Sequence, residues 1–314
     1  MHSTRPAPVT EIDDTDALRA LLTEATRPDL MSIDLASTAE LVALMNAEDA
    51  TVPQAVAAAA PAIAAAIDAI ADRMARGGRL VYVGAGTAGR VGMLDAVECP
   101  PTFNSAPGQV VALLAGGDSA FLGAAERAED NVETAPAQLA ALGIGPDDSV
   151  VGIAASGRTP YVLAGMAYAR SIGALTVGVS CNPHSQLSDV VDHPIEVVVG
   201  PEFIAGSTRL KAGTAQKLVL NMISTITMVR LGKTLGNLMV DVQATNEKLR
   251  ARAIRIIAQA SGVDETAAAA ALAAAKGDTR IAIVALGRGV DSAEARRHLD
   301  ANGGDLRRAL GAQP

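Results

Sequence analysis

The sequence contains few aromatic residues and no long hydrophobic run. Of its 314 residues three are Phe, three are Tyr and none is Trp, although hydrophobic residues make up 49% of the chain. The core must therefore be built from Ala, Val, Leu and Ile, which suits helices packed closely on a parallel sheet. The alanine-rich stretches at 52–71 and 267–275 are too weakly apolar, too interrupted or too short to span a bilayer, so no membrane contact is expected.

Cysteine and positive charge are also scarce. Cys99 and Cys181 are the only cysteines, too few for a disulfide framework and without partners at zinc-site spacing, which indicates reduced thiols and no metal. The net charge of −8 argues against a nucleic-acid partner. The first residues lack the apolar core of a signal peptide, so a soluble, cytoplasmic protein is expected.

Apolar runs alternate with helix-length segments at residues 79–83, 109–114, 148–153, 174–180 and 195–199. This alternation predicts a doubly wound α/β fold with a five-stranded parallel sheet and ligands at the carboxyl ends of the strands. Long helices are expected at 52–76, with Pro53 in the first turn, and at 209–231 and 246–261. Short segments with Asp or Thr caps then predict a small helical module. The expected division is therefore an N-terminal helical segment (1–50), a ligand-binding domain (51–245) and a C-terminal helical region (246–314).

Two of the predicted strands end in turns rich in glycine and hydroxyl groups. The first turn, residues 84–90, reads Gly-Ala-Gly-Thr-Ala-Gly-Arg, and the second turn, residues 156–159, reads Ser-Gly-Arg-Thr. Backbone N–H groups and hydroxyls in such turns can surround an anion. The pair predicts a phosphorylated small molecule held by Gly86, Thr87, Ser156, Gly157, Arg158 and Thr159.

The first turn also fits the dinucleotide fingerprint G-x-G-x-x-G. That site needs an acidic residue at the end of the next strand to bind a ribose hydroxyl, but this strand ends in Ala115-Gly-Gly, with Asp118 only afterwards. The second turn has no place in a dinucleotide fold. Phosphate capture is the better interpretation, and no nucleotide cofactor is expected.

Acidic residues near the two turns are candidates for proton transfer. Glu98 is followed by Cys-Pro-Pro, and the prolines predict a rigid, non-helical loop near the ligand, where desolvation would raise the pKa of the Glu98 carboxyl. Glu126, Glu129 and Asp130 follow the second strand. A solvated loop for Glu98 and an ordinary acidic helix face for the other three stay open as alternatives.

The segment before the long helix at 209–231 carries hydroxyls and cations together. Ser207 or Thr208 can cap this helix, and Arg209 with Lys211 can face an anion. Cations at a helix N-terminus oppose the helix macrodipole. That conflict favours contact with a ligand or partner.

These segments together resemble the N-acetylmuramic acid 6-phosphate etherases, a family built on the sugar isomerase (SIS) fold. The matching runs extend through most of residues 23–250. The most specific are Glu-Cys-Pro-Pro-Thr-Phe at 98–103 and Gly-Ser-Thr-Arg-Leu-Lys-Ala-Gly-Thr-Ala-Gln-Lys at 206–217; the others are 46–53, 84–90, 152–161 and 236–241. The resemblance implies an αβα sandwich of the SIS type with N-terminal helices and a small C-terminal helical tail.

The resemblance also implies a reaction: water cleaves the D-lactyl ether of N-acetylmuramic acid 6-phosphate, by elimination and then hydration, to N-acetylglucosamine 6-phosphate and D-lactate. The family serves cell-wall sugar recycling as a homodimer without metal or cofactor. Its two catalytic acids fall on Glu98, the proton donor, and Glu129. Ala88 stands where the family usually has Ser. A sugar-phosphate-sensing regulator, like vertebrate glucokinase regulatory protein, and a phosphosugar isomerase stay open as alternatives.

Overall fold

A parallel sheet of five strands lies at the centre of the computed structural model, which describes residues 21–117, 119–122, 127–241 and 247–311. The strand order is β2-β1-β3-β4-β5, which confirms the predicted doubly wound α/β fold. The strands are β1 (Leu80–Gly84), β2 (Val110–Leu114), β3 (Ser149–Ile153), β4 (Leu175–Ser180) and β5 (His193–Glu196). β5 begins at His193 rather than at 195, and its Pro194 is tolerated because β5 is an edge strand.

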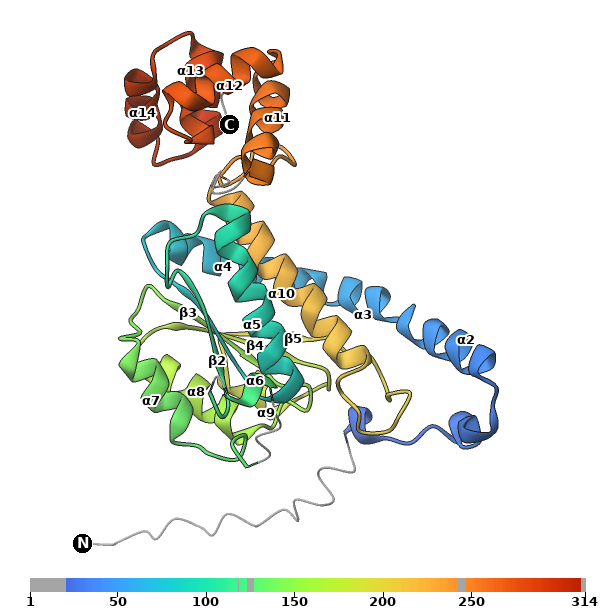
Figure 1. Cartoon of the computed structure of the whole chain (residues 1–314). Helices are drawn as coiled ribbons and strands as arrows, with labels where there is room; N and C mark the ends of the chain where they lie inside the picture. The colour runs from blue at the N-terminus through green and yellow to red at the C-terminus, as the bar shows by residue number, and fades with distance from the viewer. Residues whose placement is uncertain (1–20, 118, 123–126, 242–246, 312–314) are drawn as a thin grey trace, which may run out of the picture.

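Helices cover both faces of the sheet (Figure 1). Alternate residues of β1 point to opposite faces, with Leu80 and Tyr82 in one hydrophobic core and Val81 and Val83 in the other. The first core also contains α3 (Val52–Ala58), α4 (Ala60–Ala75), α5 (Gly86–Phe103) and α10 (Lys211–Arg230). The second contains α7 (Thr134–Ala141), α8 (Pro160–Ser171) and α9 (Gln186–Val190), and the short α6 (Ser119–Leu122) follows β2.

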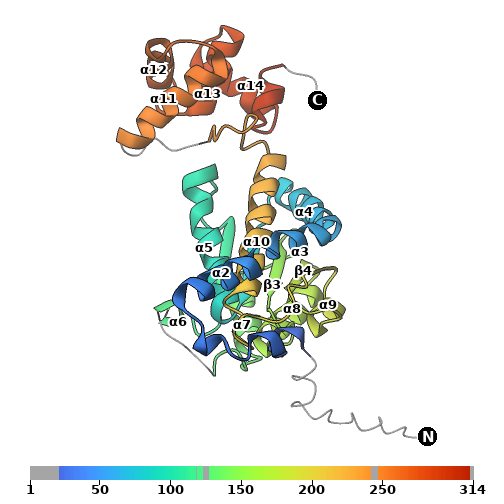
Figure 2. The ribbon, with the colours of Figure 1, turned by 90° about the vertical axis from the view of Figure 1, so that its right-hand side faces the viewer.

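The N-terminal part of the chain forms an arm at the side of the sheet domain. Three short 3₁₀ turns, η1 (Leu22–Glu24), η2 (Pro28–Leu30) and η3 (Ile33–Leu35), lead into α2 (Thr38–Asp49). Ser37 and Glu40 form a capping box that starts α2. No residue of α2 is buried, and Figure 1 shows the helix projecting away from the sheet. In Figure 2, where that side faces the viewer, α2 lies in front of the sheet domain.

The single long helix predicted at 52–76 is wrong, because the chain breaks at Ala59. α3 ends there, α4 starts with Pro61 in its first turn, and the preceding helical segment (Thr38–Ala58) makes an angle of 59° with α4. Proline lacks the N–H that would continue the helix and collides with the preceding turn. No single helix among the described residues is long and apolar enough to cross a membrane, although these two segments pass that test when taken together.

The non-helical loop predicted around Glu98 is also wrong, because α5 runs through both prolines to Phe103. Pro100 and Pro101 lie near its carboxyl end, where each removes one helical hydrogen bond. Buried Phe103 keeps the last turn on the core, and Asn104, in the left-handed conformation, ends the helix by donating its N–H to the Pro100 carbonyl.

A separate C-terminal module has its own hydrophobic core. It consists of α11 (Glu247–Ser261), α12 (Glu265–Ala274), α13 (Thr279–Arg288), α14 (Ser292–Ala301) and α15 (Leu306–Ala309). The predicted Asp caps are confirmed, because Asp264, Asp278, Asp291 and Asp305 each accept a hydrogen bond from the first turn of the following helix. The domain boundaries at 50 and 245 stay predictions.

Buried Asp241 joins this module to the sheet domain. Its carboxylate accepts a hydrogen bond from Asn104 Nδ2 at 3.2 Å and pairs with Lys233 Nζ at 2.8 Å and Arg280 Nε at 3.2 Å. The module therefore lies beyond the carboxyl end of α5, at the far end of the sheet domain from the start of that helix (Figure 1).

Candidate active site

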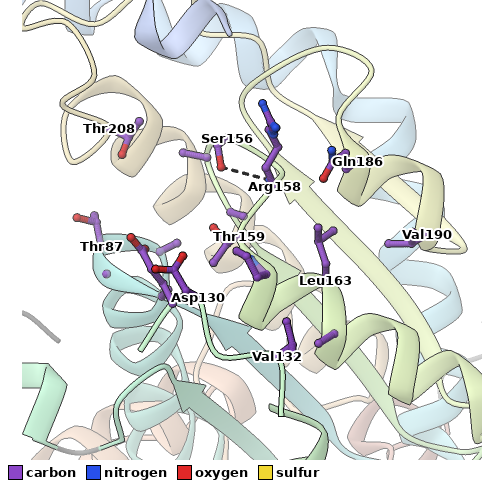
Figure 3. Close-up of a pocket in the computed structure, with 18 of the residues that line it drawn as sticks. Thr87, Asp130, Val132, Ser156, Arg158, Thr159, Leu163, Gln186, Val190 and Thr208 are labelled. Carbon is purple, nitrogen blue, oxygen red and sulfur yellow. Dashed lines mark hydrogen bonds between the residues drawn. The ribbon is translucent and has the colours of Figure 1, made fainter. Parts of the chain in front are cut away.

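A cavity of about 950 Å³ lies where β1 and β3 end and α5 and α8 begin. Its walls come from both predicted turns, from the segment after β2, from the start of α10 and from η1. Figure 3 shows Thr87, Asp130 and Thr159 gathered on one side, and Val132, Leu163 and Val190 on the other. The cavity thus has polar and apolar residues in its wall, at the predicted edge of the sheet.

The first turn brings the N-terminus of α5 to the cavity. Gly86 adopts φ +54°, and Gly86, Thr87 and Ala88 line the cavity. A Cβ on Gly84 would lie 2.7 Å from the Gly89 nitrogen, so only glycine lets α5 start this close to β1. The helix N-terminus presents backbone N–H groups and positive potential, which suit a phosphate.

The second turn is shaped by Gly157, which has φ +68°. A Cβ there would lie 2.3 Å from the Ser185 Cβ, so the turn requires glycine. Ser156 Oγ accepts the Arg158 N–H at 3.2 Å, and Ser156, Arg158 and Thr159 line the cavity. The structure therefore brings Gly86, Thr87, Ser156, Arg158 and Thr159 to one cavity, with Gly157 shaping the turn between them.

Glu129 and Asp130 line the same cavity. The Tyr161 N–H donates to the Glu129 carbonyl at 2.9 Å, which fixes this segment beside the start of α8. Burial, and secondarily the negative charge of Asp130, raise the pKa of the Glu129 carboxyl. A carboxyl with a raised pKa is suited to exchanging protons near neutral pH. Glu126 lies outside the described residues.

Within one chain, Glu98 does not join Glu129 in the cavity. It is exposed on α5 and is absent from the cavity wall. Glu98 follows Gly86 by twelve positions on the same helix, which places it about 18 Å further along the helix axis. The predicted proximity of Glu98 to the ligand fails within one chain because α5 continues where a loop was expected.

Two buried or partly buried carboxylates, Glu48 and Glu202, bind the first residues of α10. Lys211 is only 3% exposed, and its Nζ lies 2.8 Å from Glu48 Oε2. Buried Glu202 accepts the backbone N–H groups of Lys211 and Ala212, both at 2.9 Å, and so caps α10. These carboxylates resolve the conflict with the helix macrodipole. Lys211, Ser207 and exposed Arg209 are not in the cavity wall, whereas Thr208 is.

A buried carboxylate, Asp95, fixes α5 against α10 and the sheet. Its oxygens accept hydrogen bonds from Tyr82 at 2.8 Å, Asn221 at 2.6 Å and Ser224 at 3.0 Å. Burial raises the pKa of Asp95, although these three donors oppose the rise. Asp95 lies one turn before Glu98, so this network holds the part of α5 that carries Glu98 in a fixed orientation.

The two cysteines are buried and free. Burial raises the pKa of Cys99 and of Cys181 to about 12 each, so both thiols stay protonated at neutral pH. In the described part of the chain, no three His, Cys, Asp or Glu side chains are grouped as a metal ion would require.

Sequence reasoning missed some of the cavity wall. Glu24, Gln186, Thr208 and Gln216 all line it. Thr208 directly precedes the long helix predicted at 209–231 and Gln216 lies inside it, but Glu24 lies in the N-terminal arm. No local pattern signals that a residue so early in the chain reaches the sheet edge.

Comparison with known proteins identifies similar chains over most of the length. A family model described as the glucokinase regulatory protein N-terminal SIS domain matches residues 62–170, and one described as the C-terminal lid domain of that protein matches 236–280. N-acetylmuramic acid 6-phosphate etherases from Streptomyces avermitilis and Rubrobacter xylanophilus are 62% and 60% identical, each over 85% of this chain and over 86% and 89% of their own.

Solved structures also match part of the chain, at low identity. A phosphoheptose isomerase from Neisseria gonorrhoeae is 17% identical, with a TM-score of 0.46, over 61% of this chain and 98% of its own.

Proposed function

The chain belongs to the family of N-acetylmuramic acid 6-phosphate etherases, and from this premise we propose how its cavity performs the reaction. The enzyme is a carbon–oxygen lyase that cleaves the D-lactyl ether of N-acetylmuramic acid 6-phosphate, leaving N-acetylglucosamine 6-phosphate and D-lactate. It works in the cytoplasm as a homodimer, in cell-wall sugar recycling, with the phosphate of the sugar held by the two turns.

The single observation that carries this proposal is that Glu129 shares one cavity with both turns. A phosphate held by the amide and hydroxyl groups of Thr87, Ser156 and Thr159 fixes one end of the open-chain sugar. Arg158 adds positive charge in a chain whose net charge is −8. Holding the substrate in one orientation removes much of the entropic part of the barrier.

The chemistry needs a base and an acid on either side of the C2–C3 bond. Opening of the sugar ring exposes an aldehyde at C1, which acidifies the C2 proton. Glu129 takes that proton, the C3–O bond breaks with its electron pair going to oxygen, and an acid protonates the departing lactate. Water then adds at C3, and the C2 proton returns. Each positioned acid or base contributes about 10²- to 10⁴-fold in rate.

The second acid comes from another copy of the chain. The outward face of α5 carries Leu94 and Val97, which are 52% and 58% exposed, beside exposed Glu98. Neighbouring α10 exposes Met222, Ile226 and Val229. An apolar face of this kind, on two helices pinned together through Asp95, is suited to a self-complementary interface.

Twofold symmetry gives that interface a catalytic consequence. Half-buried Thr87, at the cavity, and exposed Glu98 are eleven positions apart, which places them on the same side of α5. If two α5 helices cross antiparallel, with the symmetry axis midway between these positions, Glu98 of each copy lies opposite Thr87 of the other. Each cavity then receives Glu129 from its own chain and Glu98 from the partner, with Glu98 as the acid that protonates the lactyl oxygen.

The test is release of D-lactate from N-acetylmuramic acid 6-phosphate by the purified protein. Glu129→Gln should lower kcat by about 10²-fold or more. Glu133→Gln, an exposed acid on the same segment outside the cavity wall, should leave the rate unchanged. Conversion of a phosphosugar without lactate would indicate an isomerase, and binding without any turnover would indicate a regulator.

A further inference from the structure

The first described residues of the chain form a strap (residues 21–25) tied to the second turn. Thr23 is fully buried, its N–H donates to Asn182 Oδ1 at 3.3 Å, and its hydroxyl accepts from Asn182 Nδ2 at 3.0 Å. Asn182 Nδ2 also donates to the carbonyl of Ala155 at 2.9 Å, directly before Ser156. Asn182 therefore fixes the position of the strap relative to the second turn, which is expected to bind phosphate.

The same strap is tied to the segment before α10. The Gly206 N–H donates to the Thr23 carbonyl at 3.1 Å. A Cβ on Gly206, which has φ +74°, would lie 2.7 Å from a carboxylate oxygen of Glu24. The Glu24 side chain thus lies against Gly206, and Glu24 forms part of the cavity wall. Among the described residues, no hydrogen bond or ion pair to another side chain engages its carboxylate.

Among the described residues, the cavity wall contains three carboxylates: Glu24, Glu129 and Asp130. Glu129 is assigned to proton transfer, and Asp130 lies next to it in the chain. A phosphorylated amino sugar carries donors, namely its hydroxyls and its acetamido N–H, which need acceptors once they leave water. Its anionic groups belong with Arg158 and the two turns. Glu24 is the carboxylate of these three that lies outside the Glu129–Asp130 segment assigned to proton transfer.

Resting on the function proposed above, we propose that Glu24 is a substrate-positioning residue whose carboxylate accepts hydrogen bonds from the hydroxyl or acetamido N–H donors of the sugar. The strap joins Glu24 to the second turn through Thr23 and Asn182, so the acceptor stays at a fixed distance from the phosphate. The N-terminal arm is in this way part of the binding site.

The experiment measures equilibrium binding of N-acetylglucosamine 6-phosphate and of inorganic phosphate by calorimetry. Glu24→Ala should weaken binding of the sugar phosphate about 10- to 100-fold, the range for a lost hydrogen bond to a charged group. Inorganic phosphate should bind at least as tightly as to the wild type. Glu24→Gln, which keeps one acceptor oxygen, should recover part of the loss. Asp34→Ala, an exposed acid of the same arm, is the matched control.

Equal binding of the sugar phosphate by the wild type and Glu24→Ala overturns the proposal. An equal loss of inorganic phosphate binding by Glu24→Ala also overturns it, because Glu24 would then stabilise the second turn instead of contacting the sugar. Failure of the etherase function gives a different result. If the wild type binds the sugar phosphate but releases no lactate, the proposed lyase activity is refuted, whereas the proposed role of Glu24 in binding is not.

Discussion

Two inactive variants of this protein should regain activity when they are combined in one dimer. Glu98→Gln and Glu129→Gln each remove one of the two acids from every cavity of a homodimer. In a mixed dimer, one cavity receives glutamine at both positions, and the other receives the intact Glu98 of one chain and the intact Glu129 of the other. That second cavity has the full catalytic set.

The size of the recovery follows from the symmetry. A purified mixed dimer has one intact cavity of two and should show about half the wild-type kcat per dimer. Random mixing makes half of the dimers mixed, so the unfractionated sample should recover about a quarter of the activity. The homodimeric variants should lie about 10²-fold or more below the wild type, so the recovery stands clear of the background.

The assay uses co-expression with two different affinity tags, purification on both, and measurement of D-lactate release. The control pairs a wild-type chain with a chain carrying both substitutions. If each cavity takes Glu98 from the partner, this pair lacks one acid in each cavity and is inactive; if both acids come from one chain, it has half the activity. Activity in the control together with no recovery in the mixed dimer would refute the shared cavity.

Further predictions concern single positions. Ala88→Ser adds a hydroxyl to the cavity wall and should lower KM about 10-fold, from roughly 1.5 kcal/mol for a hydrogen bond to a charged group; an unchanged KM would show that the hydroxyl does not reach the substrate. Asp130→Asn removes a charge that raises the pKa of Glu129, so the acidic limb of the kcat/KM profile should move to lower pH, and a move to higher pH would contradict Glu129 as the base. Glu48→Gln leaves the ammonium of Lys211 buried without its partner and should lower the free energy of unfolding by about 3 kcal/mol in urea titrations, whereas Asp49→Asn should change it little.

The sheet was predictable from the sequence because its signal is local. Short Val-rich runs mark β1, β3 and β4 within a residue or so, and Asp at each short C-terminal helix marks its start. The failures lie at prolines. Pro61 begins a new helix where one long helix was predicted, whereas Pro100 and Pro101 lie inside a helix where a loop was predicted. Burial of Phe103 stabilises the helix through Pro100 and Pro101, and the general rule that proline ends a helix takes no account of such tertiary contacts.

The candidate site was only partly predictable, for a similar reason. The two turns carry their own signature, and Glu129 follows β2 closely enough to reach them. The ion pair between Lys211 and Glu48 was not predictable because the two residues lie 163 positions apart in the chain. Glu24 was missed because contacts between the strap and Asn182 span 159 positions. Pairings of this separation are set by the folded chain as a whole.

The continuity of α5 has a consequence for how such a protein can vary. In the proposed dimer, one continuous helix begins at the active site of its own chain and places an acid in the active site of the partner chain. Inserting or deleting one residue between Gly86 and Glu98 would rotate Glu98 by about 100° around the axis of α5. Because the dimer is symmetric, both active sites would lose activity together. We therefore expect relatives that keep the activity to differ in length almost anywhere except along this stretch.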